Sequence, residues 1–250
     1  MRFAEPLLPG RLVRRYKRFL ADVELACGSV ATVHCPNPGG MIGLDRPGSE
    51  VWLSRSANAG RKLPLTLELI RTAGGLVGVN TSHPNRLVEE ALLAKRLPEL
   101  AGYASIRREV RYGESSRIDL LLEGPGRPIC YVEVKNVHLK RDPRTWGGPA
   151  EFPDAVTKRG AKHLRELAAA VERGARAVVL FVVQRQDCES FRIAADIDPG
   201  FERAFHEALR RGVEALCYAC KVSREAIELT RPLPLELGRG EARKTGSLRR

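Results

Sequence analysis

No apolar stretch in this sequence approaches the roughly 20 residues that a membrane-spanning helix needs. The first residues, Met1-Arg2-Phe3-Ala4-Glu5-Pro6, also lack the hydrophobic region of a signal peptide. Neither feature that would direct a chain into or across a membrane is therefore evident. We expect a cytoplasmic protein that has no membrane partner.

Cysteine is sparse, with six residues in 250, and four of the six fall inside apolar, strand-like runs. This placement is typical of reduced, buried thiols and argues against a disulfide framework. Cys217-Tyr218-Ala219-Cys220 has the CxxC spacing of a zinc ligand pair, but no second pair at finger spacing accompanies it. We therefore favour packing thiols over a structural zinc site.

Acidic side chains are outnumbered, with 30 Asp and Glu against 42 Lys and Arg, which gives a formal net charge of +12. Much of the surplus lies near the two ends, at Arg11, Arg14, Arg15, Lys17 and Arg18 and at Arg239, Arg243, Lys244, Arg249 and Arg250. Such a surplus favours a polyanionic partner through counterion release. A GC-rich genome that favours arginine explains the composition equally well.

The first 80 residues predict a small β-barrel or sandwich. Apolar residues alternate from Phe19 to Leu25, and four more short strands are predicted at Val30–His34, Glu50–Ser54, Leu65–Arg71 and Leu76–Asn80. Turns rich in glycine and proline separate them. A basic cluster on such a barrel, here Arg14, Arg15, Lys17 and Arg18, is a reasonable nucleic-acid surface.

Beyond residue 80 the pattern changes to alternating helices and strands, which predicts an α/β sandwich with partly parallel strands. The predicted helices are Pro84–Lys95, Ala161–Arg173 and Phe201–Arg211, and the later strands are Val178–Val183 and Val213–Lys221. Residues 138–151 are polar and predict a mobile loop. Residues 238–250 predict a basic, disordered tail.

Two apolar runs carry the charged residues that point to chemistry. Asp119 lies in one, and Glu133 and Lys135 share a face of the other because strand residues two apart project together. If the two strands are neighbours, Asp119 joins the pair. Two carboxylates beside an ammonium group suit a phosphodiesterase that uses Mg or Mn. The alternative is a solvated pair of charges beside an unrelated aspartate.

The order helix, strand with Asp, strand with Glu-x-Lys, helix, strand resembles the PD-(D/E)xK nuclease superfamily. The dipeptide Pro153-Asp154 follows the Glu-x-Lys strand, so we assign the metal-binding aspartate to Asp119 instead. The resemblance implies a mixed sheet flanked by helices, with magnesium or manganese bound at its edge.

The whole chain resembles a narrower family, the sugar fermentation stimulation protein A family. The resemblance lies in residues 14–23, 34–41, 79–81, 116–119, 131–135, 152–157 and 159–164, within a match of about residues 10–235. It implies an OB-like barrel over residues 1–80, a nuclease-like domain over residues 81–237, and a DNA-binding protein. Pro38 and Ala161 depart from the family pattern, where Thr and Gln are frequent.

The roles that follow are expectations. Asp119 and Glu133 would bind the metal, with Glu90 as a further ligand, and Lys135 would stabilise the attacking hydroxide and the charge on the phosphate. Arg159, Lys162 and His163 would hold the DNA backbone. A solvated helix face explains these three equally well, and a favourable helix-dipole interaction explains Glu90 equally well.

Two functional hypotheses result. The first is a DNA-binding protein with a metal-dependent nuclease site, and the second is a DNA-binding regulator of sugar (maltose) metabolism that keeps the nuclease fold without cutting. A small-molecule sugar sensor ranks last because no sugar-binding signature is present. The DNA could be single- or double-stranded, and the oligomeric state stays open, a dimer included.

Overall fold

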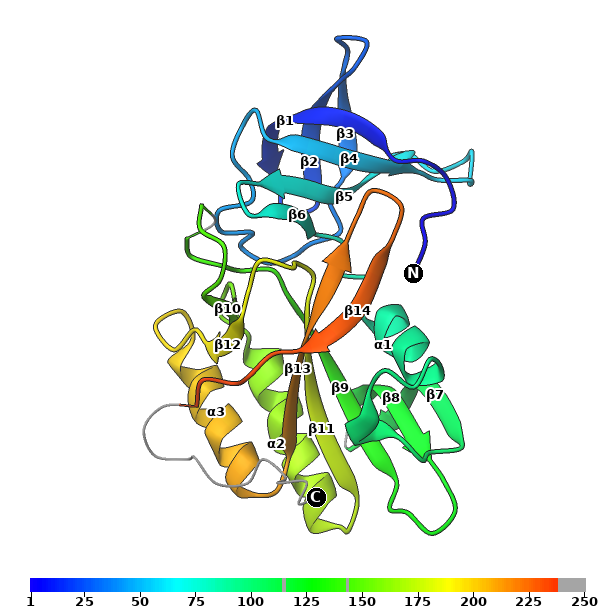
Figure 1. The fold of residues 1–250 in the computed structure, drawn as a ribbon, viewed down its shortest axis with the longest axis vertical. Helices are drawn as coiled ribbons and strands as arrows, with labels where there is room; N and C mark the ends of the chain where they lie inside the picture. The colour runs from blue at the N-terminus through cyan, green and yellow to red at the C-terminus, as the bar shows by residue number, and fades with distance from the viewer. Residues whose placement is uncertain (114–115, 143, 238–250) are drawn as a thin grey trace.

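A computed structural model describes residues 1–113, 116–142 and 144–237. The expected disordered tail at residues 238–250 lies outside the described residues. Within them, no helix is long and apolar enough to cross a membrane. The chain forms a β-barrel followed by a mixed sheet that helices cover on both faces (Figure 1).

The barrel consists of β1 (Leu8–Tyr16), β2 (Leu20–Leu25), β3 (Val30–His34), β4 (Glu50–Arg55) and β5 (Leu65–Thr72), with β6 (Gly75–Gly78) added beside β5. The strands pair in the order β3-β2-β1-β4-β5, and a parallel pairing of β3 with β5 closes the ring. The expected OB-like barrel is therefore confirmed. Its core contains alternating strand residues such as Val23, Val33 and Leu67.

The strand β1 is missing from the sequence-based prediction. Only Leu12 of its nine residues is fully buried, and exposed arginines and a Pro-Gly pair mask its weak alternation. It turns into β2 through Lys17 and Arg18, which both have positive φ angles of 49° and 62°. Two successive residues in this conformation suit a tight hairpin, and they leave both side chains exposed.

The second sheet has the strand order β14-β13-β11-β9-β8-β7, with parallel pairs in its centre and antiparallel pairs towards its edges. The strands are β7 (Ser105–Tyr112), β8 (Ser116–Glu123), β9 (Cys130–Val137), β11 (Arg176–Val183), β13 (Glu214–Val222) and β14 (Ile227–Pro232). The helix α1 (Pro84–Leu93) packs on one face, and α2 (Lys158–Glu172) and α3 (Pro199–Arg210) pack on the other. A short 3₁₀ turn, η1, spans Pro98–Leu100. The predicted α/β class is confirmed.

The segment predicted as a loop at residues 138–151 is more ordered than expected. Its end forms β10 (Pro149–Phe152), which pairs in parallel with β12 (Ser190–Ile193). His138 and Lys140 are buried, and Leu139 forms a bridge with Glu151. These polar residues point inward to partners on other segments, which a composition-based prediction does not see.

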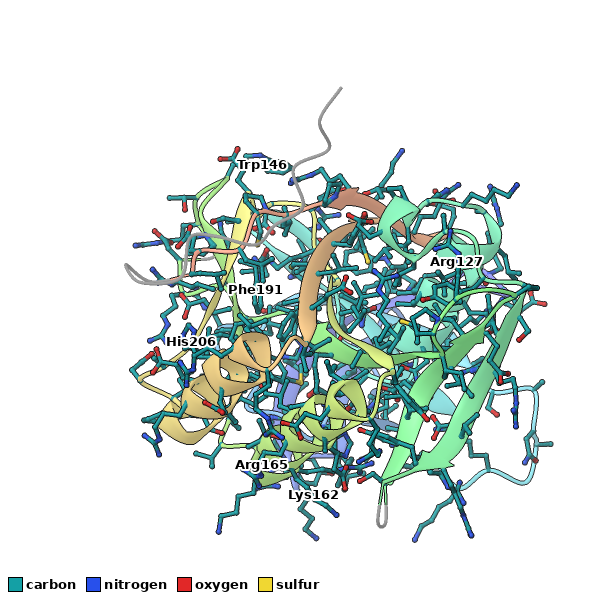
Figure 2. The ribbon with its side chains drawn as sticks, turned by 90° about the horizontal axis from the view of Figure 1, so that it is seen from below. Arg127, Trp146, Lys162, Arg165, Phe191 and His206 are labelled. Carbon is teal, nitrogen blue, oxygen red and sulfur yellow. The ribbon has the colours of Figure 1, made fainter. Side chains whose placement is uncertain are left out.

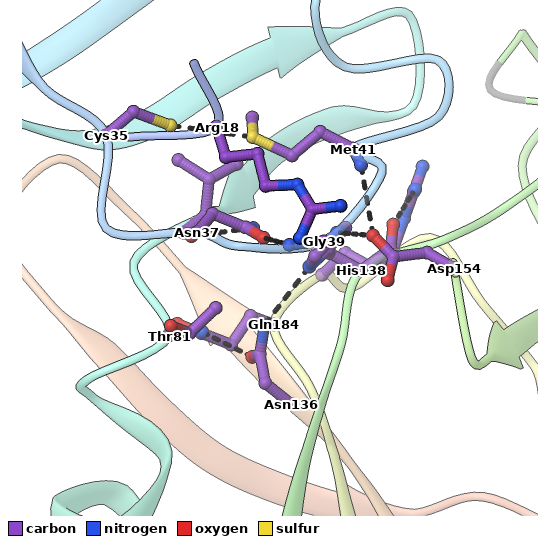
Figure 3. A network of polar contacts seen from close by, with 12 residues as sticks. Arg18, Cys35, Asn37, Gly39, Met41, Thr81, Asn136, His138, Asp154 and Gln184 are labelled. Carbon is purple, nitrogen blue, oxygen red and sulfur yellow. Dashed lines mark hydrogen bonds and ion pairs between the residues drawn. The ribbon is translucent and has the colours of Figure 1, made fainter. Parts of the chain in front are cut away.

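Polar groups join the barrel to the mixed sheet (Figure 3). The loop after β3 lies against Asp154, which accepts hydrogen bonds from the Met41 amide and from Nε2 of His138, both at 3.0 Å. Nearby, the Gln184 amide donates to the Asn80 carbonyl at 3.1 Å and to Oδ1 of Asn136 at 2.6 Å. Several of the stretches that resemble the family meet at this junction.

All six cysteines are free thiols. Cys217 packs into the core beneath α2 and α3, whereas Cys220 packs into the core beneath α1. Residues three apart on one strand point to opposite faces, so the CxxC sulfurs do not converge on a zinc ion. Burial raises the pKa of both thiols, as expected for packing residues.

Candidate active site

The strands β8 and β9 lie side by side and bring Asp119 next to Glu133 and Lys135. Their ladder ends at the Leu120–Val132 pair, after which the strands separate. The Asp119 side chain fills the gap and accepts a hydrogen bond from the Val134 amide at 2.7 Å. The fork between the strands thus places the three predicted residues together, as their spacing suggested.

Glu133 is almost completely buried, at 3% exposure, and its two oxygens differ. Oε1 accepts hydrogen bonds from Lys135 Nζ at 2.6 Å and from Nδ1 of His163. Oε2 has no partner among the described residues. Burial opposes ionisation, but the His163 hydrogen bond and the Lys135 charge outweigh it and hold the pKa of Glu133 below its usual value. The buried site therefore contains a carboxylate with a free oxygen.

Asp119 has the opposite electrostatic character. Burial and the neighbouring charge of Glu133 raise its pKa, and the hydrogen bonds from Val134 and Asn85 offset this only in part. The Asn85 amide donates to Oδ1 at 2.9 Å. A carboxylate that is costly to ionise beside a second carboxylate is stabilised by a positive charge placed between them.

The alternation of side chains between the two faces of β8 is interrupted at Asp119. Leu120 packs into the core beneath α1, but Ile118, two residues earlier, packs into the core beneath α2. Directly opposite on β7, Glu109 has a φ of 53°, which a non-glycine residue seldom adopts. The flanking pairs keep their register. This local reversal turns Asp119 towards the fork instead of into either core.

Glu90, the expected third ligand, lies elsewhere. One of its oxygens accepts from Arg86 at 2.9 Å, and the other forms an ion pair with the Met1 amino group at 2.6 Å. The side chain of α1 that reaches Asp119 is Asn85, five residues earlier and on another side of the helix. The expectation for Glu90 is therefore corrected, because the orientation of α1 directs its charge to the N-terminus.

His163 also differs from expectation. It is 5% exposed, so its ring does not face a DNA backbone. Nε of Arg159 donates to its Nε2 at 3.2 Å, which leaves Nδ1 as the proton donor to Glu133. His163 thus holds the Glu133 carboxylate in place. Gly160, Ala161 and Leu164 are buried on the same helix. Their small or apolar side chains were the available signal in the sequence that His163 faces the core.

The other predicted helix contacts face outward. Arg159 is exposed, and Lys162 lies 3.7 Å from Glu166 with its side chain half exposed. Figure 2 shows Lys162 and Arg165 on the outer side of α2. This exposed basic side remains a predicted contact surface for DNA.

The basic residues of the barrel divide into two kinds. Arg14 donates to Asp22 at 2.7 Å, and Arg15 donates to the carbonyls of Asn37 and Gly39 at 2.8 Å. These two arginines therefore also stabilise the barrel and its long loop. Lys17 and Arg18 project from the hairpin turn and stay exposed.

Tyr112 and Glu166 are site neighbours that sequence reasoning missed. The Tyr112 hydroxyl and Oε2 of Glu166 are buried without a partner among the described residues. Burial raises the pKa of Tyr112, and the charges of Glu133, Glu166 and Asp119 raise it further. An unpaired hydroxyl in this position is a ready hydrogen-bond donor for a ligand.

The donor set fits a hard divalent cation. Asp119 and Oε2 of Glu133, which has no partner in the described part of the chain, offer the carboxylate oxygens that Mg²⁺ and Mn²⁺ prefer. In the described part of the chain, no three His, Cys, Asp or Glu side chains converge as a metal cluster. A cation here would therefore rest on two carboxylates, and water or phosphate oxygens would complete its coordination.

Comparisons with known proteins cover both parts of the chain. Residues 13–79 match the model of the SfsA N-terminal OB domain, and residues 82–226 match that of the sugar fermentation stimulation protein RE domain. A sugar fermentation stimulation protein homolog of Rhodospirillum centenum is 60% identical over 94% of this chain and 99% of its own, and a Paramagnetospirillum magneticum homolog is 56% identical over 95% and 98%. The structure of Pyrococcus furiosus SfsA in complex with Ca²⁺ has a TM-score of 0.83 at 28% identity, covering 95% and 98% of the two chains.

Proposed function

We propose a nuclease function for this chain, which belongs to the sugar fermentation stimulation protein family. The reaction would be hydrolysis of DNA phosphodiester bonds with the help of a divalent cation, Mg or Mn. The observation that carries the proposal is the Glu133 carboxylate, which is buried, held ionised and left with one unpartnered oxygen beside Asp119.

In this proposal, Asp119 and Glu133 hold the cation. When bound, the cation supplies Lewis-acid stabilisation of the charge that develops on the phosphate. The Ca²⁺ in the structure of the Pyrococcus furiosus relative supports the use of a divalent cation in the family. Asn85 and the Val134 amide orient Asp119, and His163 orients Glu133, so both carboxylates are fixed before a ligand arrives.

Lys135 would act on the substrate. Its ammonium group lies 2.6 Å from Oε1 of Glu133, on the site side of β9, with 13% of its side chain exposed. From this position it can donate to a phosphate oxygen or to the attacking water and offset the negative charge of the transition state. The Tyr112 hydroxyl, which has no partner among the described residues, would be a further donor to a bound ligand.

DNA would contact both parts of the chain in this proposal. The exposed Arg159 and Lys162 of α2 would meet the backbone near the site, and Lys17 and Arg18 would meet it on the barrel. We assign residues 1–80 to DNA binding and residues 81–237 to the nuclease unit. The net charge of +12 supports a polyanionic partner.

The test is a cleavage assay on labelled DNA with Mg²⁺, Mn²⁺ or EDTA. Wild-type protein should cut or nick DNA only with a divalent cation. Lys135→Ala should lower the rate by roughly 100- to 1000-fold, as loss of one transition-state donor does, and leave DNA affinity nearly unchanged. Lys221→Ala, which removes an exposed lysine from β13, is the matched control and should cut at the wild-type rate.

A second candidate is a DNA-binding regulator of sugar metabolism that does not cut. The ion pair between Lys135 and Glu133 favours it, because this contact partly neutralises the carboxylate without a metal. Ala161 also leaves α2 without the polar group, Gln, that the family resemblance leads us to expect at this position. Wild-type protein that binds DNA but leaves single-stranded DNA, double-stranded DNA and RNA intact with both metals would favour this function over the first.

A further inference from the structure

The hairpin of β7 and β8 places two arginines directly opposite each other. Arg111 and Arg117 are paired residues in the antiparallel register, and both are exposed. Like charges in this relation repel and cost stability. A cross-strand pair that costs stability suggests that the two arginines serve a function.

The neighbouring arginines of β7 have carboxylate partners, whereas this pair has none among the described residues. Arg107 lies 3.6 Å from Glu123, and Arg108 lies 3.5 Å from Glu89. Among residues 1–113, 116–142 and 144–237, no carboxylate forms an ion pair with Arg111 or Arg117. Two adjacent guanidinium groups therefore retain their charge and their planar set of donors.

The pair lies next to the candidate cation site. Arg117 is two residues before Asp119 on β8, and Arg111 is two residues after Glu109 on β7, a separation of about 6.6 Å along each strand. Tyr112 points into the core beneath α2, so alternation directs Arg111 to the opposite face. From that face Asn85 reaches both Asp119 and Glu109.

We propose that Arg111 and Arg117 form a phosphate clamp, which binds the DNA backbone beside the phosphate at the cation site. The clamp rests on the proposed nuclease function and specifies where the bound strand continues. A guanidinium group binds phosphate oxygens in a bidentate manner, and the bound anion removes the repulsion between the two arginines. The cross-strand pair is then unfavourable only in the free protein.

The surroundings favour a nucleic acid over an acidic protein segment. The turn of the same hairpin lies against α2, since a Cβ added at Gly113 would be 3.4 Å from Oε1 of Glu166. The exposed basic residues Lys162 and Arg165 flank Glu166 on that helix (Figure 2). Basic side chains therefore lie on α2 near Gly113 as well as on the two strands, as binding to a row of phosphates requires.

The test is DNA binding by fluorescence anisotropy in EDTA, where cleavage does not interfere, at several salt concentrations. The double variant Arg111→Gln/Arg117→Gln should bind DNA at least tenfold more weakly than the wild type. The slope of log K against log salt should become shallower by about 0.9 for each phosphate that the protein no longer neutralises. The melting temperature should stay the same or rise, because the repulsion is gone.

The control is Arg96→Gln/Arg107→Gln, which removes the same charge from two exposed arginines that pair with Glu228 and Glu123. It should change the affinity by no more than about twofold. An equal loss in both double variants, or no loss in Arg111→Gln/Arg117→Gln, would overturn the clamp while DNA binding stands. Wild-type protein that fails to bind DNA would overturn both the clamp and the proposed function.

Discussion

Asp154 and Glu133 each pair with a histidine, but they differ in whether an oxygen remains for a ligand. Asp154 accepts from Nε2 of His138 and from the Met41 amide, where the barrel loop meets the mixed sheet. Glu133 accepts from His163 and Lys135 through one oxygen, and its other oxygen has no partner among the described residues. The first carboxylate joins two parts of the fold, whereas the second retains capacity for a ligand.

The groups around each carboxylate explain the difference. Asp154 meets a close-packed backbone, because Gly39 and Gly40 approach it without side chains. Glu133 meets a second carboxylate, Asp119, whose pKa is raised by burial and by Glu133 itself. A buried polar group whose hydrogen bonds are all made within the protein stabilises the fold. A buried polar group with an unused hydrogen-bonding atom gains a partner when a ligand binds.

The largest expected effect is on catalysis. Glu133→Gln keeps the shape and the His163 contact but removes the charge from the site. DNA cleavage should fall by roughly 100- to 1000-fold. The melting temperature should fall, because the lowered pKa of Glu133 means that its ionised form stabilises the fold, and circular dichroism at the assay temperature should show that the variant is still folded. Cleavage at the wild-type rate would contradict the assignment of Glu133 to the site.

Asp154→Ala should affect stability more than DNA cleavage. It removes the partner of buried His138 and of the Met41 amide, so the free energy of unfolding should fall by about 3 kcal/mol in urea titrations. Asp196→Ala, which breaks an exposed pair with Arg141, should cost no more than about 1 kcal/mol. Equal losses would mean that Asp154 has no special role at the junction.

Divalent cations should stabilise the protein through the candidate site of Asp119 and Glu133, and not through Asp154. A ligand at 100 times its Kd stabilises the folded state by about 2.7 kcal/mol, so Mn²⁺ should raise the wild-type melting temperature measurably. Asp119→Asn should abolish this shift and melt higher than the wild type without metal, because it removes a carboxylate with a raised pKa. A normal Mn²⁺ shift in Asp119→Asn would contradict the cation site. Asp154→Asn is the control and should retain the shift.

The glycines at the junction test its close packing. A Cβ on Gly39 would lie 2.5 Å from a carboxylate oxygen of Asp154, and one on Gly40 would lie 2.6 Å from its carbonyl oxygen. Gly39→Ala should therefore lower the free energy of unfolding by about 2 kcal/mol through overpacking. Gly60→Ala, where the nearest atom is 3.4 Å away, should be milder. Both are measured by chemical denaturation.

The smallest effect is on the pH dependence of stability. Burial opposes ionisation of Asp154, but the hydrogen bonds from His138 and Met41 outweigh it, so its pKa lies below the usual value. A lowered pKa means that ionised Asp154 stabilises the fold above roughly pH 4 and that this contribution is lost at lower pH. Unfolding titrations between pH 6 and pH 3 should show a small loss of stability that is absent in Asp154→Asn.

Strand alternation predicted that Glu133 and Lys135 share a face of β9. Asp119 was placed beside them only on the condition that the two strands are neighbours, and it lies where the alternation of β8 reverses. Glu90 and His163 lie on helices, where the rotation of the helix about its axis decides which residues face the site. That rotation depends on the packing of α1 against β9 and β14 and of α2 against β11 and α3, which is not a local property.

The sequence by itself determined the two folding units, the order of the elements in the second unit, and the Glu-x-Lys strand beside an aspartate. These follow from periodicity, turn residues and the resemblance to a family. Only the tertiary structure decided that Asn85 reaches Asp119, that Asp154 belongs to the junction, and that Glu133 retains a free oxygen. Each of these depends on contacts between segments distant in sequence, where geometry settles which polar groups are satisfied.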